Sequence, residues 1–434
     1  MSGSTGGLVV AALGRLAGTA EAQQLGRLAE RNRPVLHTHD PVGRRIDEVE
    51  FHPSYHALLG RALHHGLHGT PWAAADVATD AAGDVAAADA AKEHAHVERA
   101  ASFMLFSEAE PSVLCPVSMS YAVMPALRAN AALHAAWGPK LAATAYDARC
   151  LPMPQKSSVT IGMGMTEKQG GSDVRANTTR AQADGTDAWG ARFRLTGHKW
   201  FFSAPMCDAF LVLAQTSAGI SCFFMPRWLP DFVHDGARNA IRIQRLKHKL
   251  GNQANASSEV EFDGATAWLV GEAGRGVAQI LAMGALTRLD CALGTAGLMR
   301  QALSIALHHT AQRQAFGKAL LDRRQQRPHR LFALDTGGTF KGEFGLEALH
   351  LGRDLLVETV QLLLNRRDDA GPVGVGLLDH RRSLLWHETF RPSGWRSVAV
   401  RAEGRSRVVM GSGARLVCFA CRLSTISGKI LRIR

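Results

Sequence analysis

The sequence predicts an α+β fold in which a compact β-domain lies between two helical blocks. Residues 21–141 carry apolar side chains at three- and four-residue spacing, which is the helical period. Residues 157–268 change to short alternating runs interrupted by turn residues, which indicates strands. From residue 276 the helical period returns. At 434 residues the chain is long enough for two or three domains with large buried cores.

The first helical block contains one unusual stretch. Its apolar positions are Leu25, Leu28, Leu58, Leu59, Leu63, Ala101, Met104 and Leu105. Residues 72–92 form an alanine–aspartate tract of low complexity, which is either a helix with a weak apolar face or a solvated surface insertion.

The start of the chain and the cysteines indicate where the protein resides. The apolar run from Leu8 to Leu16 is short and interrupted by Arg15, so it is not a signal peptide. We find no run long enough to span a membrane. The seven cysteines are scattered and odd in number, which argues against a disulfide framework. We therefore expect a soluble cytoplasmic protein.

The net charge of +12 would favour polyanions such as nucleic acid or a phosphate-bearing tail. Much of this excess comes from Arg323 onward. Cys418 and Cys421 have the spacing of a metal or redox pair, but no second pair completes a zinc site. We therefore expect no metal.

The β-domain and the second helical block follow from local patterns. The strand-like runs are 192–196, 210–214, 222–225, 240–244 and 259–262. The helical spacing that follows uses Ile280, Met283, Leu286, Leu293, Leu298, Leu303 and Leu307.

Two segments of the β-domain carry the chemistry. Residues 163–174 combine hydroxyls with two adjacent glycines, which let backbone N–H groups come close to a ligand. Residues 197–203 supply flat aromatic side chains followed by a hydroxyl. Together they indicate a site for a large planar polar molecule. The alternative is a plain hairpin whose glycines serve turns and whose aromatic residues fill a core.

Both segments resemble the flavin-binding signatures of the acyl-CoA dehydrogenase family, and specifically of its AidB-like branch. The resemblance covers about residues 15–321. It implies an N-terminal helical domain over 1–155, a middle β-barrel or sandwich domain over 156–268, and the start of an incomplete C-terminal helical domain over 269–321. It also implies FAD as cofactor, bound by Met163, Gly164, Met165, Thr166, Glu167, Gly170, Gly171, Ser172, Phe201, Phe202 and Ser203.

The resemblance assigns roles to some of these residues. Thr166 and Ser172 would hydrogen-bond the flavin and its adjoining polar atoms. Phe201 and Phe202 would cover one ring face, and Ser203 would meet one edge.

The second helical block adds residues to the implied site. The segment 312–317 resembles the family's Arg-x-x-Phe-Gly motif. Arg313 and Phe316 would then reach the flavin of a neighbouring subunit, because an arginine fork pairs well with pyrophosphate. The site would require a homo-oligomer, a dimer or a tetramer. The alternative for Arg313 is a cation that caps a helix end. Arg288, together with Ser172, would face the acyl-CoA.

The implied activity is an FAD-dependent oxidoreductase acting on CH–CH bonds, in which a carboxylate removes a proton and flavin accepts a hydride. The glutamate that the family carries in a late Trp-Glu-Gly loop has no counterpart here, and Glu167 is better interpreted as a structural acid. The catalytic residue therefore stays unknown. The alternative is a DNA-associated flavoprotein that limits alkylation damage with little turnover, although the branch's basic double-stranded-DNA-binding domain also has no counterpart.

Residues 322–434 depart from the family. Arginine-rich, weakly periodic sequence replaces the expected amphipathic helices. We hypothesise a frameshifted, poorly ordered tail. A third reading follows, in which the product folds only over its first three quarters and has neither activity.

Overall fold

The computed structural model describes residues 5–73, 85–233 and 237–321, together with the backbone of four short strands between residues 378 and 401. The chain divides into two compact units, Met1–Arg367 and Asp368–Arg434. The second unit contains two hairpins, formed by β12 (Leu378–Asp379) with β13 (Arg382–Ser383) and by β14 (Leu385–Phe390) with β15 (Arg396–Arg401). The remainder of the hypothesised frameshifted tail lies outside the described residues.

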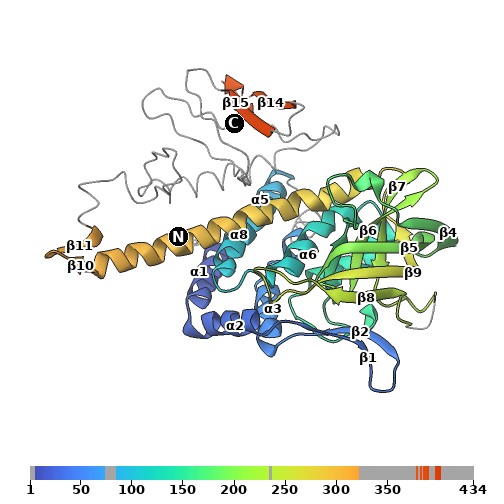
Figure 1. Ribbon diagram of the computed structural model, residues 1–434, viewed down its shortest axis with the longest axis horizontal. Helices are drawn as coiled ribbons and strands as arrows, with labels where there is room; N and C mark the ends of the chain where they lie inside the picture. The colour runs from blue at the N-terminus through green and yellow to red at the C-terminus, as the bar shows by residue number, and fades with distance from the viewer. Residues whose placement is uncertain are drawn as a thin grey trace. The chain divides into compact units, whose positions relative to one another are not determined.

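The helices of the first unit come before and after the β-domain, as expected (Figure 1). In the part of this unit that the structure describes, they are α1 (Thr5–Ala17), α2 (Ala20–Arg31), α3 (Pro53–His64), α5 (Val85–Ser107), α6 (Leu114–Leu127), α7 (Ala131–Ala142) and α8 (Gly276–Gln312). Side-chain caps fix two of the starts, because Thr19 accepts from Ala22 N at 3.1 Å and Asn130 from Leu133 N at 3.1 Å. The end of the alanine-rich tract, from Val85, belongs to α5.

Helix α8 corrects one expectation from the sequence. Its 37 residues are long and apolar enough to cross a membrane by length and composition, so the statement that no run suffices was wrong. The same test is passed by core helices of soluble proteins. α8 packs against α5 and α6 and buries Ile280, Met283 and Leu293. It is part of the helical layer that covers the sheet.

Seven strands form one mixed sheet that closes on itself. They are β3 (Ile161–Gly164), β4 (Arg180–Asp187), β5 (Gly190–Ser203), β6 (Ala209–Thr216), β7 (Gly219–Pro226), β8 (Ile241–Leu246) and β9 (Ser257–Leu269). The order β3-β6-β4-β5-β9-β7 closes because β7 also pairs with β6, and β8 extends the edge of β9. Four of the five predicted strand runs lie within β5, β6, β7 and β9, and the run 240–244 begins one residue before β8, so all five strands are confirmed. The α+β class and the closed middle domain are therefore confirmed.

The core lies between this sheet and the helices. Phe210, Phe223, Phe224 and Trp268 are fully buried. β6 and β7 are buried on both faces because α8 packs against them, which explains their continuous apolar sequence. We propose residues 1–155, 156–268 and 269–321 as the three domains of this unit.

One element was missed in the N-terminal block, which was predicted to be helical. β1 (Val35–His39) and β2 (Arg45–Glu50) form an antiparallel hairpin. Ile243 N donates to Asp47 Oδ1 at 3.1 Å, so the hairpin is fastened to β8. This long-range contact, rather than the local helical period, determines the structure of residues 35–50.

Candidate functional site

A β-bulge in β5 arranges the aromatic residues of the second motif. Lys199 pairs with Val260 and Phe202 with Ser258, so three steps of β5 face two steps of β9. Because of the extra residue, Lys199 and Phe202 both lie in the interior, at 0% and 1% exposure. The two residues between them, Trp200 and Phe201, both lie on the outside, and Phe201 is 50% exposed.

The first motif folds into a tight turn, which we call the Thr166 turn (residues 165–172). Gly170 N donates to Glu167 O at 3.0 Å, and Gly170 has a φ of +121°, which favours glycine. A Cβ on Gly171 would lie 2.9 Å from Thr166 Oγ1. The two glycines therefore let the turn close tightly beside the Thr166 hydroxyl.

Three successive contacts join the Thr166 turn to the β5 bulge. Trp200 N donates to Thr166 O at 2.8 Å. Lys199 Nζ donates to Glu167 Oε1 at 2.7 Å, and Lys168 N donates to His198 Nε2 at 3.2 Å. The two sequence motifs, about thirty residues apart, are thus neighbouring walls of one site.

The ion pair between these walls is fully buried, since both side chains are 0% exposed. Burial alone would raise the pKa of Glu167, but the charge and hydrogen bond of Lys199 and the donors of Thr178 and Thr179 lower it to about 2. Burial lowers the pKa of Lys199 to about 8, against the opposing effect of Glu167. Both groups are therefore charged at neutral pH. The Glu167 carboxylate is buried, and both of its oxygens accept hydrogen bonds from Lys199, Thr178 and Thr179.

The outer surface of the bulge combines aromatic rings with a cation. Lys247 Nζ lies 3.5 Å from the Trp200 ring centroid and 4.7 Å from that of Phe201. Its other partner is Glu259 Oε1 at 2.5 Å. A planar ring stacked on Phe201 would meet an aromatic face with a positive charge at its side.

Several of the expected cofactor residues come together here. They are Thr166, Glu167, Gly170, Gly171, Ser172, Phe201 and Ser203. Met163 and Met165 are half-buried and pack against the core. Gly164 is buried on β3, where a Cβ would lie 2.8 Å from the Phe202 ring.

Phe202 requires a correction. It was expected to cover a flavin face, but the bulge turns its side chain into the core. Its ring centroid lies 4.2 Å from that of Phe210. At 1% exposure it leaves no surface for a ligand.

Two expected residues of the second helical block, Arg313 and Phe316, lie at the end of α8 that is far from the sheet within one chain. Arg288 is exposed on α8. Arg313 follows the last residue of α8, a helix about 55 Å long whose first part packs against β7. Phe316 is 89% exposed in the small hairpin of β10 (Gln314–Ala315) and β11 (Lys318–Ala319), at the far end of α8 from the sheet (Figure 1).

A small cavity of about 100 Å³ adjoins the site and was not found from the sequence. Its lining includes Lys247, Lys249, Asn255 and Ser257. Ser257 Oγ lies 3.2 Å from Ser203 Oγ, which connects the cavity to the end of the bulged strand. The buried Asn255 Oδ1 has no hydrogen-bond partner within the protein. No local pattern in the sequence predicts that Asn255 is buried at this cavity.

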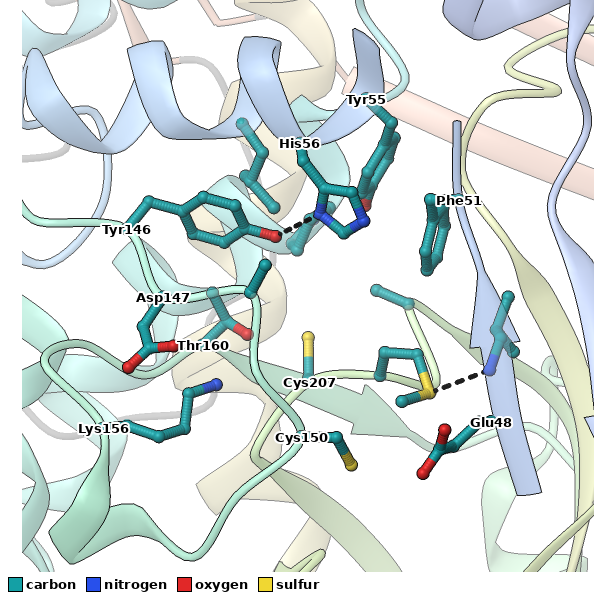
Figure 2. Close-up of a pocket in the computed structure, with 16 residues that line it drawn as sticks. Glu48, Phe51, Tyr55, His56, Tyr146, Asp147, Cys150, Lys156, Thr160 and Cys207 are labelled. Carbon is teal, nitrogen blue, oxygen red and sulfur yellow. Dashed lines mark hydrogen bonds between the residues drawn. The ribbon is translucent and has the colours of Figure 1, made fainter. Parts of the chain in front are cut away.

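A larger cavity, of about 250 Å³, lies elsewhere (Figure 2). It is lined by residues of α3, β2, α6, the segment 146–160 and the loop before β6. In it His56 Nδ1 lies 2.8 Å from Tyr146 Oη, and Cys150 and Cys207 lie on the opposite side of the opening (Figure 2). None of the expected site residues lines it, and sequence reasoning missed it.

The residues at the Thr166 turn fit a large planar polar group. An exposed aromatic side chain, a close glycine turn and hydroxyls at two edges are present together. Across residues 5–73, 85–233 and 237–321, no group of three or more His, Cys, Asp or Glu side chains could hold a metal ion.

Family comparisons match two successive parts of the chain. Residues 2–148 match the Adaptive response protein AidB N-terminal domain. Residues 162–265 match the acyl-CoA dehydrogenase middle domain, which includes both motifs.

Two curated relatives match over 315 residues each. Putative acyl-CoA dehydrogenase AidB of Escherichia coli (strain K12) is 48% identical, over 72% of this chain and 54% of its own length. Acyl-CoA dehydrogenase family member 11 of Caenorhabditis elegans is 32% identical, over 69% of this chain and 46% of its own length. The chain thus spans about half the length of these relatives.

Solved structures agree with this assignment. The apo-form of Bd2924 matches with a TM-score of 0.63 and 28% identity, over 80% of this chain and 64% of that chain. Caenorhabditis elegans ACDH-11 in complex with C11-CoA matches with a TM-score of 0.60 and 27% identity, over 80% of this chain and 54% of that chain. An AidB N-terminal domain is thus followed by an acyl-CoA dehydrogenase middle domain, and the chain belongs to the AidB-like branch of the acyl-CoA dehydrogenase family.

Proposed function

We propose that this chain is an FAD-dependent, acyl-CoA dehydrogenase-type oxidoreductase that acts on CH–CH bonds. The single observation that carries the proposal is the half-exposed Phe201 ring beside the closed Thr166 turn. The bound C11-CoA of the ACDH-11 relative supports an acyl-CoA as the substrate class. When bound, FAD would supply the hydride acceptor.

The chain's own residues would bind and orient the two molecules. Phe201 would stack on one face of the ring, while the hydroxyls of Thr166 and Ser203 would hydrogen-bond its edges. Ser172 and Arg288 would hold polar parts of the acyl-CoA, and the guanidinium fork of Arg288 suits phosphate oxygens. The tight packing of the turn would exclude water from the inner edge of the ring.

We propose that no residue of the Thr166 turn removes the substrate proton. Glu167 is the acid within this turn, and its paired, fully buried carboxylate has a pKa lowered to about 2. A general base needs access to the substrate and a pKa closer to the working pH. The base therefore remains unassigned among the described residues.

A second subunit would complete the site. Arg313 and Phe316 lie at the far end of α8, so they could reach a flavin only in a neighbouring chain. α8 also exposes apolar side chains, including Met299 at 60% and Ile305 at 64%, which a partner could cover. Light scattering of the purified chain should report at least a dimer, and a monodisperse monomer would contradict this part.

The alternative is a DNA-associated flavoprotein with little turnover, which the net charge of +12 favours. One preparation tests both functions. The purified chain should be yellow, or become so with added FAD, and should reduce an electron acceptor with some member of an acyl-CoA panel. Steeply salt-dependent DNA binding without turnover would favour the alternative. A folded chain that shows no visible flavin band after incubation with excess FAD would contradict both.

A further inference from the structure

We propose that the buried Glu167–Lys199 ion pair is a positioning device that sets the spacing between the Thr166 turn and the Phe201 face. The inference rests on the proposed flavin site and deepens it. The pair lies directly behind both walls, because Glu167 follows Thr166 in the chain and Lys199 precedes Trp200 and Phe201. Any shift of the pair therefore moves the walls.

The Glu167 carboxylate also closes the loop that carries the motif. Thr178 N donates to its Oε2 at 2.6 Å and Thr178 Oγ1 at 2.9 Å, while Thr179 N donates to its Oε1 at 3.2 Å. The same Oε1 accepts from Lys199 Nζ at 2.7 Å. One side chain thus joins the two ends of residues 167–178 and fastens them to β5. Gly170, Gly171 and Ser172 lie within this closed loop.

The β5 bulge leaves a gap in the ladder that the Thr166 turn fills. Pairing with β9 stops after Lys199 and resumes at Phe202, opposite Ser258. Instead, Trp200 N donates to Thr166 O. That hydrogen bond holds only if the turn stays in place, and the ion pair beside it supplies the second, charge-assisted contact.

A merely stabilising role predicts something different. Replacing both members of a buried ion pair by neutral side chains is often neutral or favourable for stability, whereas removing one member leaves a buried charge. If the pair only stabilised the fold, a neutral double variant would keep ligand binding. If it positions the turn, the double variant would fold and still bind flavin poorly.

The chain offers a matched control. Lys156 and Asp208 form a second buried pair in the same domain, at 2.6 Å and with 6% and 8% of their side chains exposed. Asp208 Oδ2 accepts from Thr160 N at 2.8 Å, directly before β3, and among the described residues the side-chain partners of Asp208 are Lys156 and Thr160, both outside the Thr166 turn. Lys156→Met therefore reports the general cost of breaking a buried pair.

The test compares the full chain with Lys199→Met, with the double variant Glu167→Gln and Lys199→Met, and with Lys156→Met. The measurements are the thermal midpoint, FAD affinity from flavin fluorescence quenching, the visible band of bound FAD, and hydrogen exchange over residues 166–172. The double variant should keep a thermal midpoint near that of the parent chain. It should bind FAD about 10- to 100-fold more weakly, shift the bound flavin band and exchange faster over residues 166–172. Lys156→Met should change neither the band nor the exchange of this segment.

Two outcomes would overturn the inference. One is a folded double variant with parental FAD affinity and parental exchange. The other is a Lys156→Met variant that loses FAD affinity as strongly as Lys199→Met. If the parent chain itself binds no FAD, the proposed function fails, and the exchange comparison alone decides whether the pair orders the turn.

Discussion

The extra residue in β5 decides which aromatic side chain of the motif can meet a ligand. Phe201 and Phe202 are neighbours in sequence, yet the first is 50% exposed and the second 1%. A Phe202→Ala variant should lower the free energy of unfolding by about 3–5 kcal/mol, because it leaves a cavity beside Phe210. Phe201→Ala should change it by less than about 1 kcal/mol, because the side chain is half exposed and lies on the outside of the sheet.

The affinity for FAD should depend on Phe201 rather than on Phe202. Phe201→Ala should weaken FAD binding roughly three- to tenfold, since an aromatic contact contributes about 0.5–1.5 kcal/mol. Urea denaturation and FAD titration of the two variants check both halves. Equal stability loss in both, or unchanged FAD affinity in Phe201→Ala, would contradict the bulge geometry as the basis of the site.

Part of the site could be predicted from the sequence at the level of single residues. The glycines and hydroxyls of 163–174 and the aromatic run of 197–203 identified the two walls. The inward turn of Phe202 could not be foreseen, because a β-bulge depends on the register with β9. The orphan Asn255 Oδ1 was equally invisible, since burial without a partner is a property of the folded chain.

Between elements, a buried ion pair joins helices α5 and α8. Arg99 on α5 donates through Nη2 to Asp290 Oδ2 on α8 at 2.7 Å, and both side chains are 2% exposed. Asp290→Ala would leave the guanidinium buried without its carboxylate and should destabilise the protein by about 3–5 kcal/mol. The exposed pair Arg242–Asp263 is the control, and Asp263→Ala should cost less than about 1 kcal/mol. Similar losses in the two variants, measured by urea denaturation, would refute this assignment.

Two buried histidines beside Arg99 should make the same helical layer sensitive to acid. Burial, with Arg99 nearby, lowers the pKa of His68 and of His96 to about 4. In the unfolded chain they titrate near the ordinary value of 6.5. The unfolded state therefore binds protons first as the pH falls. The contribution of these two histidines to the free energy of unfolding should be fully present above pH 6.5. It should decline towards pH 4, by roughly 3 kcal/mol for each histidine at the acid end.

Urea denaturation at intervals between pH 7.5 and 4.5 would measure how the free energy of unfolding falls with pH. His96→Gln can still hydrogen-bond Tyr121 but cannot charge, so its stability should fall less steeply with acid. An unchanged slope would show that His96 does not titrate as its burial implies.

The elements show where local patterns suffice. The predicted strand runs within 192–262 were confirmed, because alternation and turn residues act locally there. The hairpin β1–β2 was missed because its stabilising contact, Asp47 with Ile243 N, spans about two hundred residues. α8 has the length and hydropathy of a membrane span, while its buried Asp290 pairs with Arg99 in the helical layer.

Across the chain, the family and the order of its parts could be predicted, because two long motifs lie in the right order. The larger cavity could not be predicted from the sequence. Its walls come from α3, β2, α6, the segment 146–160 and the loop before β6, and no periodicity links them. Only the folded chain brings His56 and Tyr146 within 2.8 Å of each other.

After residue 321 the sequence departs from the family. We propose that a reading-frame change replaced the segment that carries the family's glutamate. Translation of the two alternative frames downstream of codon 317 should recover a Trp-Glu-Gly-type loop, and its absence from both would defeat the proposal. A chain rebuilt in the recovered frame would regain a general base. It should oxidise acyl-CoA about 10²- to 10⁴-fold faster than the present chain at matched flavin content. Equal rates for the two chains would mean that the base lies elsewhere, within the residues that already form the fold.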